Sequence, residues 1–327
     1  TFLNEIAYQL DFGRIGVVAF FAISGFVICP TLKGGRYQGA RRFLISRFFR
    51  LFPAFWTSMI LVLLVMFVWQ GRAIDTAQVL GNIPMLYSFF NVEPLEGLYW
   101  TLEVELICYL LCLALFVCGL LHKPLILFFL GLVLMAASEW IFSRPDIKSA
   151  ITSALNIEWM FMPWNLAIMF WGGLFRIWYD DRLRRCQIFS VSVPVVALVL
   201  ALLFAILWSP LLLTCTWIMQ GKLWALHEMV PYFFGMGLFI AGALFIKLSN
   251  PLLVWLGTIS YSIYLLHPIA IHGLLTLLNT KLPEWMSMHL SLYLFVCLLL
   301  SILLAGLVYH GIEKPAIKLG RSLQKFG

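Results

Sequence analysis

Long, uninterrupted runs of apolar residues alternate with short polar stretches along the whole chain. A helix needs about 20 apolar residues to cross a bilayer, and nine runs reach roughly that length. The clearest of them, from Ile188 to Trp208, contains no charged residue. Because the runs are continuous rather than alternating, they predict helices and not the strands of a membrane barrel. The nine predicted spans are 13–31, 51–69, 98–118, 124–143, 161–179, 188–208, 229–247, 251–272 and 288–310.

The composition agrees with this pattern. Of 327 residues, 62% are hydrophobic and only 11% are charged, whereas soluble domains carry about 25% charged residues. A soluble fold and a disordered chain are both excluded on this ground. The sequence therefore predicts an all-α polytopic membrane protein, with one domain over residues 1–327 and a C-terminal tail at 311–327. Cys108 and Cys112, four residues apart, are interpreted as packing residues rather than metal ligands, and no metal site is expected.

Lysine and arginine predict the orientation, because cytoplasmic loops are enriched in both. Sixteen of the 22 basic residues fall in one alternating set of loops, which should be cytoplasmic. The chain then begins outside and ends inside, and its net charge of +7 needs no nucleic-acid partner. Residue 1 is Thr and no targeting segment precedes the first span. We therefore expect the natural protein to carry at least one further span before residue 1.

Polar side chains within the third predicted span fall on one helical face. Thr101, Glu105 and Tyr109 are spaced by four residues. A carboxyl group inside a bilayer is costly and usually faces the interior of the bundle. The spacing alone leaves a functional and a structural role for Glu105 equally open.

The eighth span carries a second polar stripe. Ser260, Tyr264 and His267 lie at positions i, i+4 and i+7 of an otherwise apolar helix, and Pro268 follows His267. A proline frees backbone groups and can bend the helix. The stripe fits either a functional site or a set of hydrogen bonds that holds helices together.

The first predicted cytoplasmic loop ends in a run of arginines. Arg47 and Arg50 are three residues apart and share a helical face, while Pro53 is expected in the first turn of the helix that follows. Paired guanidinium groups bind phosphate strongly. The alternative is that these arginines only mark the cytoplasmic side and attract anionic lipid.

Five segments, in order, resemble the membrane-bound acyltransferase-3 family. The third contains its Trp-Ser/Thr-Leu-x-x-Glu pattern, and the fourth contains its Ser-Tyr-x-x-Tyr-Leu-x-His pattern. Each segment is short, but together they extend over most of the chain. The segments are Gly13–Phe26, Arg47–Pro53, Trp100–Glu105, Ile259–His267 and Glu313–Pro315.

This resemblance implies a ten-helix enzyme of the bacterial cytoplasmic (inner) membrane, with its C-terminus in the cytoplasm. Such an enzyme transfers an acyl group, commonly acetyl from acetyl-CoA, to a hydroxyl of a sugar, a cell-envelope glycan or a lipid-linked precursor. It implies acyl-CoA, the bilayer and a glycan acceptor as partners. In the family, an N-terminal helix carries a basic residue and, eleven residues later, a histidine taken as the base. No part of this sequence matches that pattern.

The resemblance also favours particular site residues. Arg47 and Arg50, with Arg42, are expected to hold the phosphates of coenzyme A. His267 is assigned to proton transfer or acceptor positioning, and Glu105 to orienting a histidine or binding acceptor hydroxyls. Tyr264, Ser260 and Trp100 are expected to bind the acceptor, and Tyr264 or Ser260 to donate to the developing oxyanion.

Two alternatives stay open. Direct transfer and a covalent acyl-enzyme route both fit, and the second would let the acyl group cross the membrane to an acceptor mouth in the external loops. A transporter or flippase, or a catalytically inactive accessory protein, would use the same intramembrane Glu and His differently. The residues expected at the acceptor mouth are Glu93, Glu96, Asn156, Trp159 and Trp164.

Overall fold

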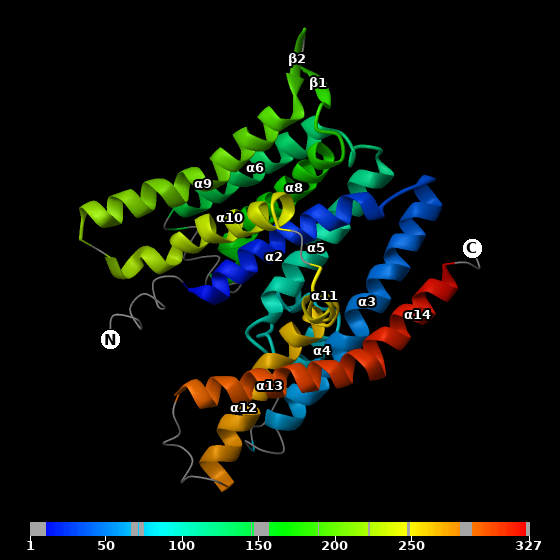
Figure 1. Ribbon diagram of the computed structural model, residues 1–327, viewed down its shortest axis with the longest axis vertical. Coiled ribbons are helices and arrows are strands. Elements are labelled where there is room, and N and C mark those ends of the chain that lie inside the picture. The colour runs from blue at the N-terminus through cyan, green and yellow to red at the C-terminus, as the bar shows by residue number, and fades with distance from the viewer. Residues whose placement is uncertain are drawn as a thin grey trace. The chain divides into compact units, whose positions relative to one another are not determined.

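The computed structural model describes residues 11–66, 71, 75–144, 146, 157–188, 190–221, 223–246, 249–281 and 290–324. Its helices form two compact units (Figure 1), each treated separately below. Unit 1 comprises Thr1–Tyr37 and Trp100–Lys247, and unit 2 comprises Gln38–Tyr99 and Leu248–Gly327. Asn156, one of the residues expected at the acceptor mouth, lies outside the described residues, as do residues 67–69, 189, 247 and 288–289 of the predicted spans.

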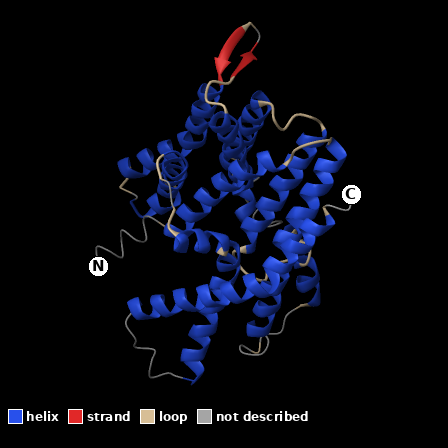
Figure 2. Ribbon diagram, turned by 45° about the vertical axis from the view of Figure 1, so that its right-hand side comes forward, coloured by secondary structure: helices blue, strands red, loops and turns tan. Residues whose placement is uncertain are grey.

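The all-α polytopic prediction is confirmed. Seven helical segments in the described residues are long and apolar enough to cross a membrane. The two other predicted spans form α8 (Met162–Asp180) and α10 (Val230–Leu244). At about 1.5 Å per residue, the 15 residues of α10 cover less than the bilayer core of about 30 Å. Figure 2 shows that, in the described part of the chain, strand is confined to one hairpin.

Unit 1 is built around α8, which packs against α2, α6 and α9, while α10 packs on α2 and α9. The contact between α2 and α8 is close because glycine lies on both sides. A Cβ on Gly25 would lie 1.8 Å from the Met169 carbonyl oxygen, and one on Gly172 would lie 2.3 Å from that of Ala22. Small residues allow such approach in membrane helices. The other helices of unit 1 are α2 (Phe12–Ile28), α5 (Tyr99–Val117), α6 (Pro124–Ser143) and α9 (Val195–Met219).

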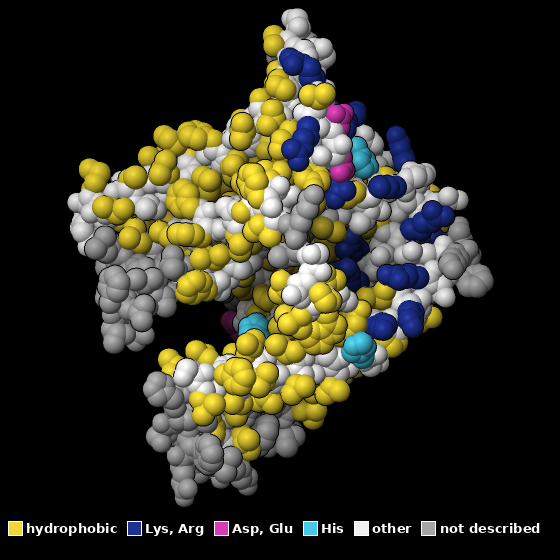
Figure 3. Space-filling model, viewed as in Figure 1, with side chains coloured by type: hydrophobic (Ala, Val, Ile, Leu, Met, Phe, Trp, Pro, Cys, Tyr) yellow, Lys and Arg dark blue, Asp and Glu magenta, His cyan; other side chains and the backbone are white. Residues whose placement is uncertain are grey.

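In the described residues of unit 1, three short 3-10 helices accompany these α-helices. Of these, η4 leads directly into α8, and η5 precedes α10. The outward faces of α9 and α10 carry exposed apolar side chains, among them Phe204 and Leu238 (Figure 3). Such faces suit contact with lipid. The 3-10 helices are η1 (Cys29–Thr31), η4 (Ile157–Phe161) and η5 (Leu223–Glu228).

The sixth span begins later than the hydrophobic run predicts. Strands β1 (Arg185–Ile188) and β2 (Val191–Pro194) pair antiparallel before the helix, and α9 starts at Val195. Two factors explain the delay. The β-branched residues at 191 and 193 favour extended backbone, and Pro194 disfavours helical backbone in the residue before it.

Unit 2 contains α3 (Arg36–Leu64), and this helix corrects the prediction for Pro53. The arginine-rich segment is not a loop, because it forms the first half of α3 and continues without a break into the apolar half. Pro53 therefore lies inside the helix and not in its first turn. Because proline has no N–H, the carbonyl of Phe49 lacks its helical donor at this point.

The eighth predicted span is two helices rather than one. It consists of α11 (Pro251–Thr258) and α12 (Ser260–Lys281), separated at Ile259. Ser260, Tyr264 and His267 all belong to α12, so their predicted common face is retained. The short elements α4 (Thr76–Asn82) and η3 (Tyr87–Phe90) also belong to unit 2.

The C-terminal segment of unit 2 is helical to residue 323. Helix α13 (Leu290–Val308) packs on α12 and continues through the π-helical turn η7 (Tyr309–Glu313) into α14 (Lys314–Leu323). Helix α14 is docked on α3, where the Gln324 amide donates to the Arg42 carbonyl at 3.0 Å. The predicted tail at 311–327 thus includes the helix α14.

Candidate functional site

A cavity of about 870 Å³ lies at one end of unit 1. It is enclosed by the first turns of α2, α5, α8 and α10 and by the C-terminal parts of α6 and α9. These are the ends that the distribution of Lys and Arg predicts to lie together on one side of the membrane. The cavity therefore follows from the alternating direction of successive helices.

The cavity has aromatic walls and polar groups among them. Its polar lining residues are Asp11, Arg14, Glu139, Ser143, Asn165, Ser209 and Glu228. Its aromatic residues are Trp100, Phe142, Phe161, Trp164, Trp217 and Tyr232. Flat apolar surfaces with a few placed hydrogen-bonding groups are typical of small-ligand pockets. Trp100 and Trp164 were predicted at the acceptor site, and both lie here.

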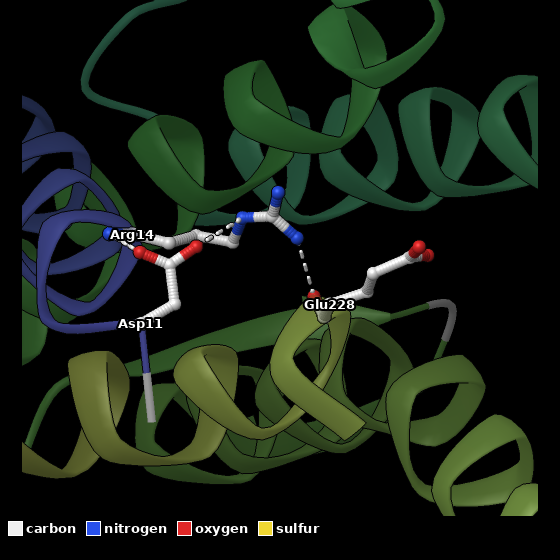
Figure 4. A network of polar contacts seen from close by, with 3 residues as sticks. All are labelled: Asp11, Arg14 and Glu228. Carbon is white, nitrogen blue, oxygen red and sulfur yellow. Dashed lines mark hydrogen bonds and ion pairs between the residues drawn. The ribbon is translucent and has the colours of Figure 1, made fainter. Parts of the chain in front are cut away.

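Arg14 is held at the mouth of this cavity by two groups (Figure 4). Its Nη1 donates to the backbone carbonyl of Glu228 at 3.0 Å, and its Nε lies 3.5 Å from Asp11 Oδ2. Asp11 also caps α2 by accepting from the Arg14 backbone N–H at 3.1 Å. In Figure 4 the carboxylate of Glu228 points away from the guanidinium. The Arg14 charge is therefore balanced by Asp11 and not by Glu228.

Deeper in unit 1, Glu105 lies in a hydroxyl network. Its side chain is buried, and its Oε1 accepts from Ser24 Oγ at 3.2 Å and from the Tyr109 hydroxyl. The predicted common face of Glu105 and Tyr109 is confirmed by the second of these bonds. Ser24 comes from another helix and was not anticipated, because nothing in the local spacing links residues so far apart in the chain.

The segment that contains Ser24 explains one of the family-like patterns residue by residue. Ser24 donates to Glu105, and Gly25 lets the backbone of α8 approach α2. Phe26 packs its ring against Phe239 at 5.8 Å and carries the Arg176 guanidinium 4.8 Å from its centre. These three residues thus provide, in order, a buried hydrogen bond, a close approach of two helices and aromatic packing at the centre of unit 1.

In unit 2, His267 is oriented by the backbone of its own helix. Pro268 has no N–H, so the carbonyl of Tyr264, four residues earlier, lacks its helical donor. His267 Nδ1 lies 2.8 Å from that carbonyl oxygen. Because a carbonyl only accepts, Nδ1 carries the hydrogen, and in the tautomer that has no second ring hydrogen the lone pair is on Nε2. The role predicted for His267 stays a prediction.

Three other polar residues in the first half of α12 donate to backbone carbonyls of unit 2. The Tyr261 hydroxyl donates to the Leu51 carbonyl at 3.0 Å, and the Tyr264 hydroxyl to the Leu98 carbonyl at 3.3 Å. Ser260 is exposed and donates to the Gly257 carbonyl at 2.9 Å. Tyr264 would therefore have to exchange a backbone partner before it donated to an oxyanion, and so would Ser260. Their predicted roles stay predictions.

Ser262 was not among the predicted site residues. It makes the shortest of the hydrogen bonds described for α12. Its hydroxyl donates to Glu313 Oε2 at 2.5 Å, and both side chains are buried. Glu313 opens the Glu-Lys-Pro segment, so this bond joins two of the family-like patterns. It ties α12 to the π-helical turn after α13.

The predicted phosphate-binding residues all lie on α3. Arg47 is half-buried, with its guanidinium 5.4 Å from the ring centre of Phe43, while Arg42 and Arg50 are exposed. The common helical face predicted for Arg47 and Arg50 is retained because the arginine-rich segment is helical. In the described residues, no cluster of three or more His, Cys, Asp or Glu side chains is arranged to hold a metal ion.

The helices and their buried polar networks define a multi-pass helical membrane protein. A family model for an acyltransferase domain matches residues 1–310. The chain therefore belongs to the acyltransferase-3 family of membrane acyltransferases, whose members are of the O-acyltransferase type and use an acyl donor.

One distant relative extends the comparison. The chain is 24% identical to Nodulation protein 10 of Rhizobium leguminosarum bv. viciae over 357 aligned residues, which cover 97% of this chain and 85% of the relative. No solved structure matches the chain.

The cavity itself was missed at the sequence level, although two signals pointed towards it. Arg14 and Asn165 are polar residues near the predicted external ends of apolar runs. Glu139 and Glu228 also lie near the ends of spans. Charged residues are common there, so their position alone does not indicate a site. Three other described residues of the expected acceptor mouth do not line this cavity: Trp159 belongs to unit 1, whereas Glu93 and Glu96 belong to unit 2.

Proposed function

We propose that this membrane acyltransferase moves an acetyl group from acetyl-CoA to a hydroxyl of a sugar, either in a cell-envelope glycan or in a lipid-linked precursor. The reaction forms a bond between the acceptor oxygen and the acyl carbon and breaks the C–S bond of the thioester. Coenzyme A leaves as the thiol, which takes up the proton that the acceptor hydroxyl loses. The observation that carries this proposal is the cavity of unit 1.

The cavity suits a sugar because of its chemistry. Rings such as Trp100 and Trp217, which are partly exposed, offer flat apolar surfaces to the C–H faces of a pyranose. Asn165 and the carboxylates offer donors and acceptors to its hydroxyls. At about 870 Å³ the cavity lies within the usual range of ligand pockets, about 300–1,000 Å³, and has room for more than one sugar ring.

We place this cavity on the outer side of the membrane and the C-terminus in the cytoplasm. The far end of α8 supports this orientation, because basic residues collect there. Arg184 Nη2 lies 3.4 Å from the His122 carbonyl, and Arg176 pairs with Asp180 at 2.9 Å. A basic end is typical of the cytoplasmic side.

We assign the donor to α3 and proton transfer to α12. Arg47 and Arg50, helped by Arg42, would bind the phosphates of acetyl-CoA through charge-assisted hydrogen bonds. His267 would accept the proton of the acceptor hydroxyl at Nε2, since its Nδ1 is committed to the Tyr264 carbonyl. A positioned base contributes about 10²–10⁴-fold to the rate. Glu105 would orient catalytic or acceptor groups.

The test uses purified full-length protein in proteoliposomes with radiolabelled acetyl-CoA and a panel of oligosaccharides. We expect label in an alkali-labile ester on an oligosaccharide. Replacing both arginines (Arg47→Ala with Arg50→Ala) should raise the KM for acetyl-CoA at least tenfold, whereas Lys33→Ala, an exposed basic residue predicted on the same side, should not. An unchanged KM in the double variant would refute the donor assignment.

The same preparation separates the enzyme from the transporter alternative. Acetyl-CoA consumption that depends on an added oligosaccharide supports acyl transfer. Movement of an oligosaccharide across the vesicle membrane without any consumption of acetyl-CoA would instead support a flippase. A chase without acceptor tests the covalent route, because that route predicts label retained on the denatured protein.

A further inference from the structure

The cavity of unit 1 has an excess of negative charge among its described lining residues. The lining contains three carboxylates, those of Asp11, Glu139 and Glu228, and one cation, Arg14. The ion pair with Asp11 balances that cation, and Figure 4 shows the Glu228 carboxylate turned away from it. Two carboxylates, on Glu139 and Glu228, are therefore left to act on a ligand.

Besides these acidic residues, the wall of the cavity contains buried polar groups that can bind a ligand. Asn165 is 3% exposed and lines the cavity. Trp164 also lines it and is 1% exposed, and its indole Nε1 is buried without a hydrogen-bond partner among the described residues. A buried donor without a partner is costly, so a ligand that accepts from it would be stabilised.

We propose that the acceptor is a cationic sugar, a glycan unit with a free amine, whose ammonium group is held by Glu139 and Glu228 while aromatic rings hold its pyranose face. This inference rests on the proposed function and specifies its acceptor. Hydrogen bonds to ionised groups are roughly twice as strong as neutral ones. A neutral N-acetylated unit would bind more weakly, and an acidic sugar would be repelled by both carboxylates.

The experiment compares three trimeric acceptors with purified full-length protein and labelled acetyl-CoA. They are a glucosamine trimer with free amines, its fully N-acetylated counterpart, and a galacturonic acid trimer. Slightly below neutral pH, where the amines are protonated, we expect kcat/KM for the free-amine trimer to exceed that for the N-acetylated trimer by at least tenfold. Label released by mild alkali identifies the ester and separates it from acylation of the amine.

The variant Glu139→Gln with Glu228→Gln tests the charge directly. It should reduce the preference for the free-amine trimer to about twofold or less, and a Tm close to that of the parent protein shows that the variant is folded. Asp181→Asn, an exposed carboxylate at the opposite end of α8, is the control and should keep the full preference.

Tryptophan fluorescence provides a second measurement, which reports binding of the acceptor without any acyl transfer. Because Trp100, Trp164 and Trp217 line the cavity, the free-amine trimer should change the emission without acetyl-CoA, and the charge-removing variant should need about tenfold more trimer for the same change. Equal use of the amine and N-acetylated trimers, or better use of the acidic one, would overturn the inference and leave the proposed function standing. If no acceptor takes up label, the proposed function itself fails.

Discussion

The orientation of His267 gives a prediction that separates a catalytic from a structural role. Pro268→Ala restores an N–H four residues after Tyr264, so the Tyr264 carbonyl regains a helical donor. That donor competes with His267 Nδ1, which lies 2.8 Å from the same oxygen in the parent protein. The imidazole is then free to turn or to move its hydrogen to Nε2, and in that tautomer Nε2 cannot accept a proton.

The size of the effect follows from the bond that is lost. A hydrogen bond of this kind contributes about 0.5–1.5 kcal/mol net, and about 1.4 kcal/mol corresponds to a factor of ten. The share of His267 in the productive tautomer should therefore fall by roughly two- to tenfold, and kcat with it. The KM for acetyl-CoA should not change. Stability should not fall, because alanine is about 3 kcal/mol more favourable than proline inside a helix.

Steady-state kinetics and thermal unfolding of the two proteins in detergent check this prediction. His267→Asn serves as the matched control, since its amide keeps a donor near the Tyr264 carbonyl but offers no basic nitrogen. It should lose about 100-fold or more in kcat with a similar Tm. If Pro268→Ala has the parent kcat while its Tm rises, the freed carbonyl does not orient a catalytic base, and our reasoning about His267 is refuted.

Three further predictions concern the buried contacts of each unit. Gly25→Ala should lower the Tm by several degrees, because its Cβ would meet a carbonyl of α8 at 1.8 Å and overpacking costs about 1–3 kcal/mol; Gly237→Ala, with open space around it, should not lower it. Ser262→Ala removes a donor from the buried Glu313 and should cost about 1–3 kcal/mol, measured by denaturation; an unchanged stability would show that the bond is dispensable. Glu105→Gln keeps an acceptor oxygen but loses the ionisable carboxyl group, so we expect about a 100-fold loss of kcat with little change in Tm; equal activity would remove Glu105 from the mechanism.

The helical type of the membrane spans could be predicted because hydropathy is a local property. Their ends could not be predicted as well, since a few residues of backbone preference decide them. The arginine-rich segment is an example, because its charges suggested a loop while its backbone continues α3 through Pro53. The break at Ile259 is another, because an apolar run gives no sign that the helix stops and restarts within it.

In the candidate site, too, contacts between residues close in sequence could be predicted and contacts between distant residues could not. Glu105 and Tyr109 are four residues apart, so helical periodicity alone predicted that they share a face. Ser24 is 81 residues from Glu105, and no periodicity reaches that far. The cavity of unit 1 depends on the ends of six helices, so its walls emerge only once those helices have packed.

Residue type alone could not have separated a functional from a structural stripe on α12. The bilayer supplies no hydrogen-bond partners, so any polar side chain in a span must find one in the protein, whether or not it also does chemistry. Tyr261, Ser262 and Tyr264 each donate to a carbonyl or carboxylate of unit 2, which is the structural behaviour. His267 meets the same demand with only one of its two ring nitrogens. The partner of Nδ1 is a carbonyl that Pro268 leaves available, so this bond satisfies the backbone and does not use Nε2. In the mechanism that we propose, the proline after the histidine is therefore the feature that allows one residue to meet the structural demand and also to serve as a base.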